Sequence, residues 1–197
     1  MKKIISVHVF FAVISAAFYY KNPYGPNLVW NMFLALAALD FAYVMYRLRN
    51  RFLVAVLAIL WLLFYPNTFY MLTDAVYFTW AKEILTDQQA LINFFIFMSS
   101  ILFGVLCGVY SWQLVVEKFR VDNPWLRYIA IAGLSLVSSF AIHIGRYARL
   151  NSWDVFTDPM MVVREIMAVA NSGALYFIIG FTCFQVMTLV FTDKDYS

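Results

Sequence analysis

Two polar stretches in an otherwise apolar chain carry side chains that could bind a ligand or transfer a proton. They read YPNTFYMLTD, residues 65–74, and IGRYARLNSWD, residues 144–154. An arginine can clamp a phosphate or carboxylate through paired hydrogen bonds, and a histidine beside a carboxylate can exchange protons near neutral pH. The candidate ligand-binding residues are Asn31, Asn67, Tyr70, Asp74, Arg146, Arg149, Asn151 and Asp154. The candidate catalytic residues are His143, Asp74 and Asp154.

The composition predicts that these stretches belong to a membrane protein. The chain of 197 residues is 64% hydrophobic, 20% aromatic and only 13% charged, with a mean hydropathy of +0.76. Soluble domains are about half apolar and about one quarter charged. A soluble fold of this size could not cover itself with so few charges, so we expect an integral membrane protein whose surroundings are the lipid bilayer.

Six apolar windows are long enough to cross a membrane as helices, which need roughly 20 residues each. They lie at about residues 4–20, 28–46, 52–72, 90–113, 127–146 and 172–191. We therefore predict an all-α bundle of about six transmembrane helices, forming one polytopic domain over residues 1–197. The first window could instead be a signal peptide cleaved after the small residues 15–17, but the aromatic residues at 18–20 favour a retained helix.

Lysine and arginine predict the orientation of these helices. With the N-terminus in the cytoplasm, nine basic residues fall in cytoplasmic segments and five fall outside, which favours both termini inside the cell membrane. Arg146, Arg149 and Arg164 depart from this rule, since they belong to the last outer loop. They suggest a binding role there, with anchoring to headgroups as the alternative. The net charge of +3 is small and lies in loops, so no nucleic acid is expected as a partner.

The last outer loop, residues 147–171, should contain a short helix of its own. Asp158 followed by Pro159 is a typical N-cap and first helical residue. The residues that follow, 160–170, are mostly apolar. We expect this helix to lie along the membrane surface.

Helix geometry predicts that several polar groups share one depth. Counting about 1.5 Å per residue from Arg51 places Tyr70 near the outer surface of a hydrocarbon core about 30 Å thick, with Asn67 about 4–5 Å below it. The same count along the fifth and second windows places His143 and Asn31 in the same outer layer. Lipid cannot hydrogen-bond such groups, so they should face the bundle interior or a cavity.

The directions of the side chains around the helix also favour one shared polar face. Asn67, Tyr70 and Asp74 fall within about 60° of one another on a helix, and Pro66 should disturb the helix beside them. Hydrogen bonding between helices, worth about 0.6 kcal/mol per contact, is the alternative to a binding site. Asp40 lies nearer the cytoplasmic side, and we expect it to reach an arginine of the 47–51 cluster.

Three motifs carry a resemblance to a known family. They are Trp30-Asn31 in VWNMFLA; Tyr65-Pro66-Asn67, Tyr70 and Thr73-Asp74 in WLLFYPNTFYMLTD; and Gly145-Arg146, Arg149 and Asn151-Ser152-Trp153-Asp154 in IGRYARLNSWD. Over about residues 28–190 the chain resembles the bacterial membrane-protein family catalogued as domain of unknown function 1361. The resemblance implies a multipass fold and no particular activity.

Three functions remain open at this point. The polar residues could form an outward-facing pocket that binds or transports an anionic lipid headgroup or small solute. They could form an intramembrane enzyme for a lipid-linked substrate, with His143 as acid or base, Asp74 or Asp154 orienting it, and Ser152, Thr73 or water as nucleophile. They could also only stabilise a structural or accessory subunit.

Several chemistries are poorly supported by the residues. The chain contains no GxSxG, HExxH or P-loop motif. Two histidines on distant windows do not suggest a zinc site. Asp74, Asp154 and Asp158 could bind a hard cation, but nothing in their spacing demands it. We therefore expect neither a metal nor another cofactor. Cys107 and Cys183 lie inside apolar runs, which predicts packing residues and no disulfide.

Overall fold

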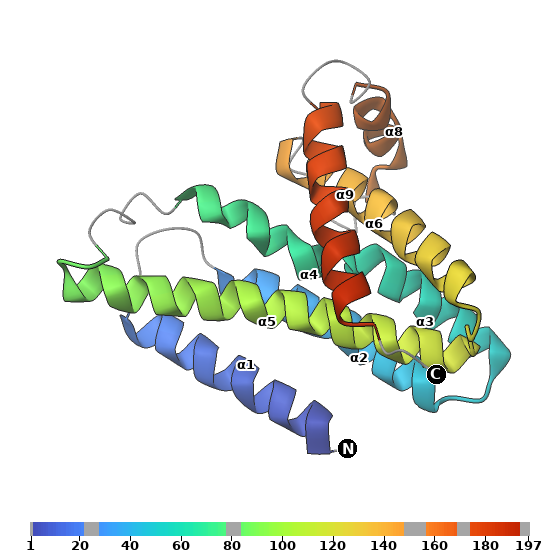
Figure 1. Ribbon diagram of the computed structural model, residues 1–197, viewed down its shortest axis with the longest axis horizontal. Coiled ribbons are helices and arrows are strands. Elements are labelled where there is room, and N and C mark those ends of the chain that lie inside the picture. The colour runs from blue at the N-terminus through green and yellow to red at the C-terminus, as the bar shows by residue number, and fades with distance from the viewer. Residues whose placement is uncertain (1, 22–27, 78–83, 148–156, 169–173, 194–197) are drawn as a thin grey trace.

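The computed structural model shows a bundle of helices (Figure 1). It describes residues 2–21, 28–77, 84–147, 157–168 and 174–193. The elements are α1 (Lys2–Lys21), α2 (Leu28–Arg47), α3 (Arg51–Phe64), α4 (Pro66–Tyr70), the 3-10 helix η1 (Met71–Tyr77), α5 (Gln88–Phe119), α6 (Pro124–Tyr147), α8 (Pro159–Ala168) and α9 (Ala174–Phe191).

The prediction of an all-α membrane bundle is confirmed. Within the described ranges, six segments are long and apolar enough to cross a membrane: Lys2–Lys21, Leu28–Arg47, Arg51–Val76, Gln88–Phe119, Pro124–Tyr147 and Ala174–Phe191. The short helix expected in the last long loop is α8, and the Asp158 side chain caps it by accepting a hydrogen bond from the Met161 N–H at 3.0 Å. Its position along a membrane surface stays a prediction.

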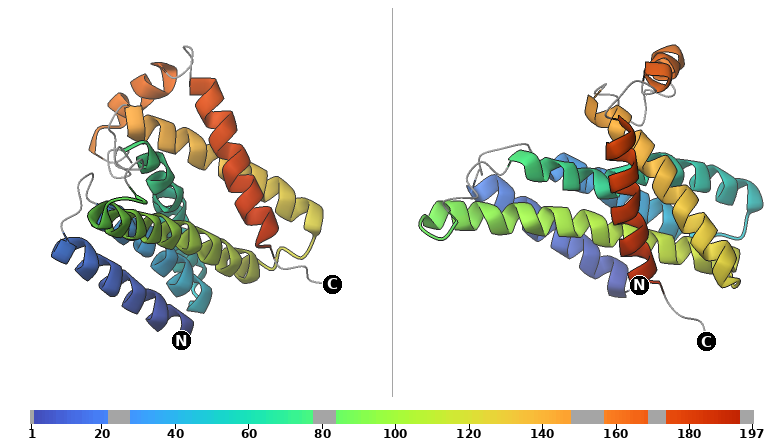
Figure 2. Two further views of the ribbon diagram at one scale, coloured as in Figure 1. Left: turned by 60° about the vertical axis from the view of Figure 1, so that its left-hand side comes forward. Right: turned by 45° about the horizontal axis from the view of Figure 1, so that its top comes forward.

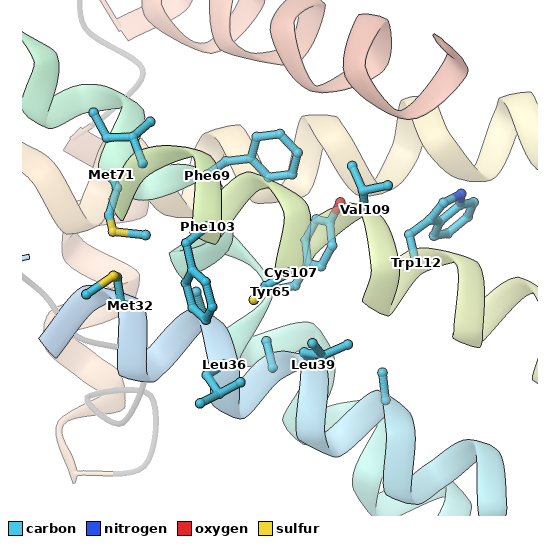
Figure 3. Close-up of a cluster of buried hydrophobic side chains, with 14 of the residues drawn as sticks. Met32, Leu36, Leu39, Tyr65, Phe69, Met71, Phe103, Cys107, Val109 and Trp112 are labelled. Carbon is cyan, nitrogen blue, oxygen red and sulfur yellow. The ribbon is translucent and has the colours of Figure 1, made fainter. Parts of the chain in front are cut away.

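Helices α2 and α5 form the centre of the bundle. They pack along each other over most of their length, and each buries a large part of its side chains. Side chains from α2, from the α3–η1 segment and from α5 meet there in one apolar cluster (Figure 3). Helix α1 lies on the outside of this centre, while α9 packs alongside α6 (Figure 2). The outward faces of α1, α3 and α9 expose large apolar side chains, as helices in contact with lipid do.

The third span breaks where the sequence predicts it. Helix α3 ends at Phe64, and α4 starts with Pro66 as its first residue, because proline has no N–H to continue the hydrogen-bond ladder. The Asn67 side-chain amide donates to the Phe64 carbonyl at 3.0 Å, and the Thr68 hydroxyl donates to the Tyr65 carbonyl at 2.7 Å. The chain then tightens into η1. The break is therefore stabilised by its own side chains, and it redirects the residues that follow.

Two glycines of α5 allow the broken segment to approach closely. A Cβ atom on Gly108 would lie 2.6 Å from the Thr68 hydroxyl oxygen and 2.9 Å from a ring carbon of Phe69. A Cβ atom on Gly104 would lie 2.8 Å from the Thr68 carbonyl oxygen. Pairs of small residues four apart are a common means of bringing membrane helices together. This Gly104-x-x-x-Gly108 pair thus fixes the position of α4 and, through it, of η1.

Candidate functional site

Asp74 of η1 is the centre of the polar residues that the structure brings together. Its side chain is only 3% exposed. One carboxylate oxygen, Oδ1, accepts a hydrogen bond from Nη1 of Arg146 in α6 at 2.9 Å. The other, Oδ2, accepts from the side-chain amide of Asn31 in α2 at 3.4 Å. The carboxylate thus receives donors from two different helices.

The Arg146 guanidinium makes further contacts around this carboxylate. Its Nη2 donates to the backbone carbonyl of Thr73 at 3.4 Å. The Tyr70 hydroxyl lies close enough to interact with it electrostatically. The Arg146 side chain is 19% exposed, so part of it stays at the surface while its partner is enclosed. We name the group of Asn31, Tyr70, Asp74 and Arg146 the Asp74–Arg146 corner.

Burial makes this ion pair energetically demanding. Removing a carboxylate from water costs several kcal/mol unless a well-placed cation and additional hydrogen bonds compensate. The corner supplies both, through the guanidinium and through the Asn31 amide. The Gly104–Gly108 contact positions η1 for this arrangement, and the C-terminal turn of α6 brings Arg146 to it. The corner therefore joins α2, η1 and α6 at one end of the bundle.

Two predicted site residues, Asn67 and His143, are near residues of the corner in sequence, but their side chains contact other groups. The Asn67 amide is bonded to the Phe64 carbonyl in the helix break. The ring of His143 lies 4.4 Å from the ring of Tyr147 and 5.4 Å from that of Phe177, between centroids. Its buried Nδ1 atom has no hydrogen-bond partner in the described part of the chain. His143 thus belongs to an aromatic cluster, and the structure shows no contact between it and Asp74.

Arg149, Asn151, Ser152 and Asp154 lie outside the described residues. Their membership of the site stays a prediction, including the catalytic role considered for Asp154. Among the residues that the structure does describe, no three His, Cys, Asp or Glu side chains are close enough to share a metal ion.

The expectation that Asp40 pairs with an arginine of the 47–51 cluster is wrong. Its carboxylate oxygen Oδ2 lies 3.3 Å from Nε2 of His8 in α1. The other ring nitrogen of His8 contacts the Ile4 carbonyl of its own helix at 2.9 Å. His8 lies near the start of α1, and Asp40 lies at a similar distance from the end of α2. The two side chains are therefore level with each other and meet directly, so Asp40 does not extend along α2 to the arginines.

Sequence reasoning also missed a buried polar contact between α6 and α9. The Gln185 side chain is fully buried, and its amide donates to the Ser139 hydroxyl at 2.7 Å and to the Ser135 carbonyl at 3.4 Å. A glutamine in the middle of an apolar span was the available signal, because such a residue requires a partner in lipid. This contact explains how α9 is fixed on α6, and it lies apart from the corner.

Comparison with known proteins identifies a family and no activity. A family model described as "Protein of unknown function (DUF1361)" matches residues 30–188, which confirms the expected resemblance. No curated protein and no solved structure matches the chain. The matched range includes Asn31, Asp74 and Arg146, whereas α1 precedes it.

Proposed function

The chain belongs to the DUF1361 family of proteins of unknown function, and we propose that it binds, and as a membrane protein transports, an anionic lipid headgroup or small anionic solute at the Asp74–Arg146 corner. The observation that carries this proposal is the partly exposed side chain of Arg146 beside an enclosed carboxylate. A guanidinium recognises phosphate and carboxylate groups through its planar set of donors. Asp74 holds that cation in place, and part of the Arg146 side chain stays exposed.

The proposal includes a location and an orientation. We place the protein in a bacterial cell membrane with both termini in the cytoplasm, so that the corner faces outward. The excess of lysine and arginine in the segments on the terminal side supports this arrangement. A green fluorescent protein fused after residue 197 should fluoresce, whereas an alkaline phosphatase fused there should be inactive. The reverse pattern would exclude an outward-facing corner.

Binding can be tested with headgroup analogues that lack acyl chains. Glycerol 3-phosphate, inorganic phosphate and succinate should each be titrated into the purified protein in detergent by calorimetry. Arg146→Lys keeps a positive charge beside Asp74 but removes the paired donors, so it should weaken binding of the favoured anion at least tenfold. Arg127→Lys is the matched control, because Arg127 also pairs with an aspartate, Asp193, at the other end of α6.

A structural role is the second candidate, and the burial of Asp74 favours it. The same ion pair joins η1 to α6, so it could serve only to hold the two parts of the bundle together. In that case none of the three anions binds the wild-type protein, and Arg146→Lys only lowers its stability. Unchanged anion affinity in a folded Arg146→Lys variant would equally contradict the binding proposal. The enzyme hypothesis receives less support, since the His143 ring contacts Tyr147 and Phe177 and not the carboxylate.

A further inference from the structure

A groove between α1 and α5 lies apart from the Asp74–Arg146 corner. Its volume is about 610 Å³, within the range of about 300–1,000 Å³ that small-molecule sites occupy. Most of its lining is apolar, with Phe10 and Ile14 from α1 and Leu102 and Leu106 from α5. Helix α1 lies obliquely beside α5 in Figure 1, and the two do not close on each other along this stretch.

The length of the groove corresponds to one leaflet of a bilayer. Along α1 it extends from Lys3 to Ile14, which is about 16 Å of helix at 1.5 Å per residue, and along α5 it extends from Ser99 to Gln113, which is about 21 Å. Half of a hydrocarbon core about 30 Å thick is about 15 Å. The groove therefore begins where α1 begins and ends near the middle of the membrane.

The charged group and most of the polar groups of the lining lie toward the end where α1 begins, whereas Ser99 lies near the other end. The Lys3 ammonium lies 3.8 Å from the centre of the Tyr110 ring, and both residues line the groove. Gln113 also lines it, and its amide donates to the Thr192 carbonyl at 3.0 Å, just beyond α9. The cation–π contact holds the ammonium at the mouth of the groove. The site thus combines an apolar channel of leaflet length with a cation at its membrane surface.

A hydrocarbon chain with a negatively charged headgroup suits this groove. Its lining is mostly apolar, and the Lys3 ammonium stands at the end where α1 begins. An ammonium near a membrane surface attracts anionic lipids.

We propose that the groove holds an acyl chain of an anionic phospholipid from the leaflet on the terminal side, with the lipid phosphate at Lys3. The apolar lining matches the chain, and the ammonium matches the phosphate. The site is independent of the Asp74–Arg146 corner, which lies at the opposite ends of the helices and needs no acyl chain for its ligand. Helix α1 is thereby fixed to α5 partly through lipid.

Native mass spectrometry tests this site directly. Protein in detergent is titrated with palmitoyl-oleoyl phosphatidylglycerol, and in parallel with the zwitterionic phosphatidylcholine of the same chains. The wild-type protein should retain one phosphatidylglycerol more strongly than phosphatidylcholine. Lys3→Gln should reduce that retention about fivefold, as expected for one lysine near a membrane surface. Lys2→Gln is the matched control, because Lys2 does not line the groove.

Filling the groove provides a second set of variants. Leu106→Trp and Leu102→Trp should reduce the retention of both lipids, since both positions line the groove. Leu62→Trp, on the exposed face of α3, should not. Lys3→Arg should retain the wild-type preference, which separates loss of charge from loss of folding. Lys3→Gln should leave the binding of glycerol 3-phosphate, inorganic phosphate and succinate at the Asp74–Arg146 corner unchanged, so failure of this proposal is distinguishable from failure of the corner.

Four results would overturn the proposal. The first is equal retention of the two lipids by the wild-type protein. The second is an equal effect of Lys3→Gln and Lys2→Gln. The third is an equal effect of the groove-filling variants and Leu62→Trp. The fourth is an intact mass showing that residues of α1 have been removed from the mature chain.

Discussion

Two acidic residues inside the spans meet basic partners on other helices, and their surroundings differ sharply. The Asp74 and Arg146 side chains are 3% and 19% exposed, with their closest atoms 2.9 Å apart. The Asp40 and His8 side chains are 39% and 47% exposed, with their closest atoms 3.3 Å apart. Asp74 also receives the Asn31 amide, whereas Asp40 has His8 as its described polar contact. Both aspartates therefore have a basic partner, and the two pairs differ in how deeply their side chains are buried.

Helix α5 accounts for this difference, because it packs closely against α4 and leaves a groove toward α1. Toward α4 it presents Gly104 and Gly108, which bring backbone against backbone and press η1 into the bundle. Toward α1 it presents larger side chains, including Leu102 and Leu106, and a groove of about 610 Å³ remains. Asp74 is carried by the closely packed segment. Asp40 faces the loosely packed helix, and so its pair stays half exposed.

The largest expected effect is on the enclosed pair. Arg146→Gln should lower the free energy of unfolding by about 3–5 kcal/mol, because it leaves the Asp74 carboxylate buried without its cation. Asp74→Asn should have a similar effect by leaving the guanidinium without its carboxylate. Unfolding in mixed micelles, followed by circular dichroism over increasing SDS, measures both changes.

The double variant shows whether these losses come from the pair itself. Asp74→Asn combined with Arg146→Gln should cost less than the sum of the single changes, with a coupling free energy above about 1 kcal/mol. Additive losses would mean that each residue acts through other contacts. Burial of the Asp74–Arg146 pair would then not explain why its loss costs more than the loss of the exposed Asp40–His8 pair.

The second prediction concerns the packing that encloses Asp74. Gly108→Ala should lower the free energy of unfolding by about 1–3 kcal/mol, because the new methyl group would overlap Thr68 and Phe69. Gly104→Ala should act in the same direction through the Thr68 carbonyl. The same unfolding assay applies, and a double variant with Asp74→Asn should show coupling if the glycines support the corner.

Glycines elsewhere in the chain provide the matched controls. A Cβ atom on Gly133 or on Gly180 would meet nothing within 4 Å. Replacing either by alanine inside a helix should therefore be neutral or stabilising by up to about 1 kcal/mol, since glycine is the poorer helix former. Equal losses at Gly108 and Gly133 would contradict the role assigned to close packing.

The sequence predicts the elements better than it predicts their contacts. The six apolar spans, the break at Pro66 and the cap at Asp158 follow from local rules, and the structure confirms them. These features depend on composition, on a missing N–H and on a side chain that bonds its own backbone. None of them requires knowledge of where another helix lies.

Contacts between helices depend on how each helix is rotated about its axis and on which helices lie beside it. Counting residues along a helix gives only the depth of a side chain in the membrane. Counting residues placed His143 in the same layer as the corner, but the helix turns its ring toward Tyr147 and Phe177. The glycine pair of α5 has the spacing of a small-residue motif, yet its partner is a broken helix about 40 residues earlier. Asp40 likewise needed the position of α1 before His8 could be identified as its partner.

The smallest expected effect is on the exposed pair, and it completes the comparison. His8→Leu should lower the free energy of unfolding by about 0.6 kcal/mol, and by no more than about 2, which is the range for single polar contacts between membrane helices. Val9→Leu, an exposed neighbour on α1, is the matched control and should change nothing measurable. A double-mutant cycle with Asp40→Asn gives the coupling free energy of the pair. A coupling as large as that between Asp74 and Arg146 would show that half-exposure does not weaken a polar contact between helices in this bundle, and the distinction drawn from enclosure would fail.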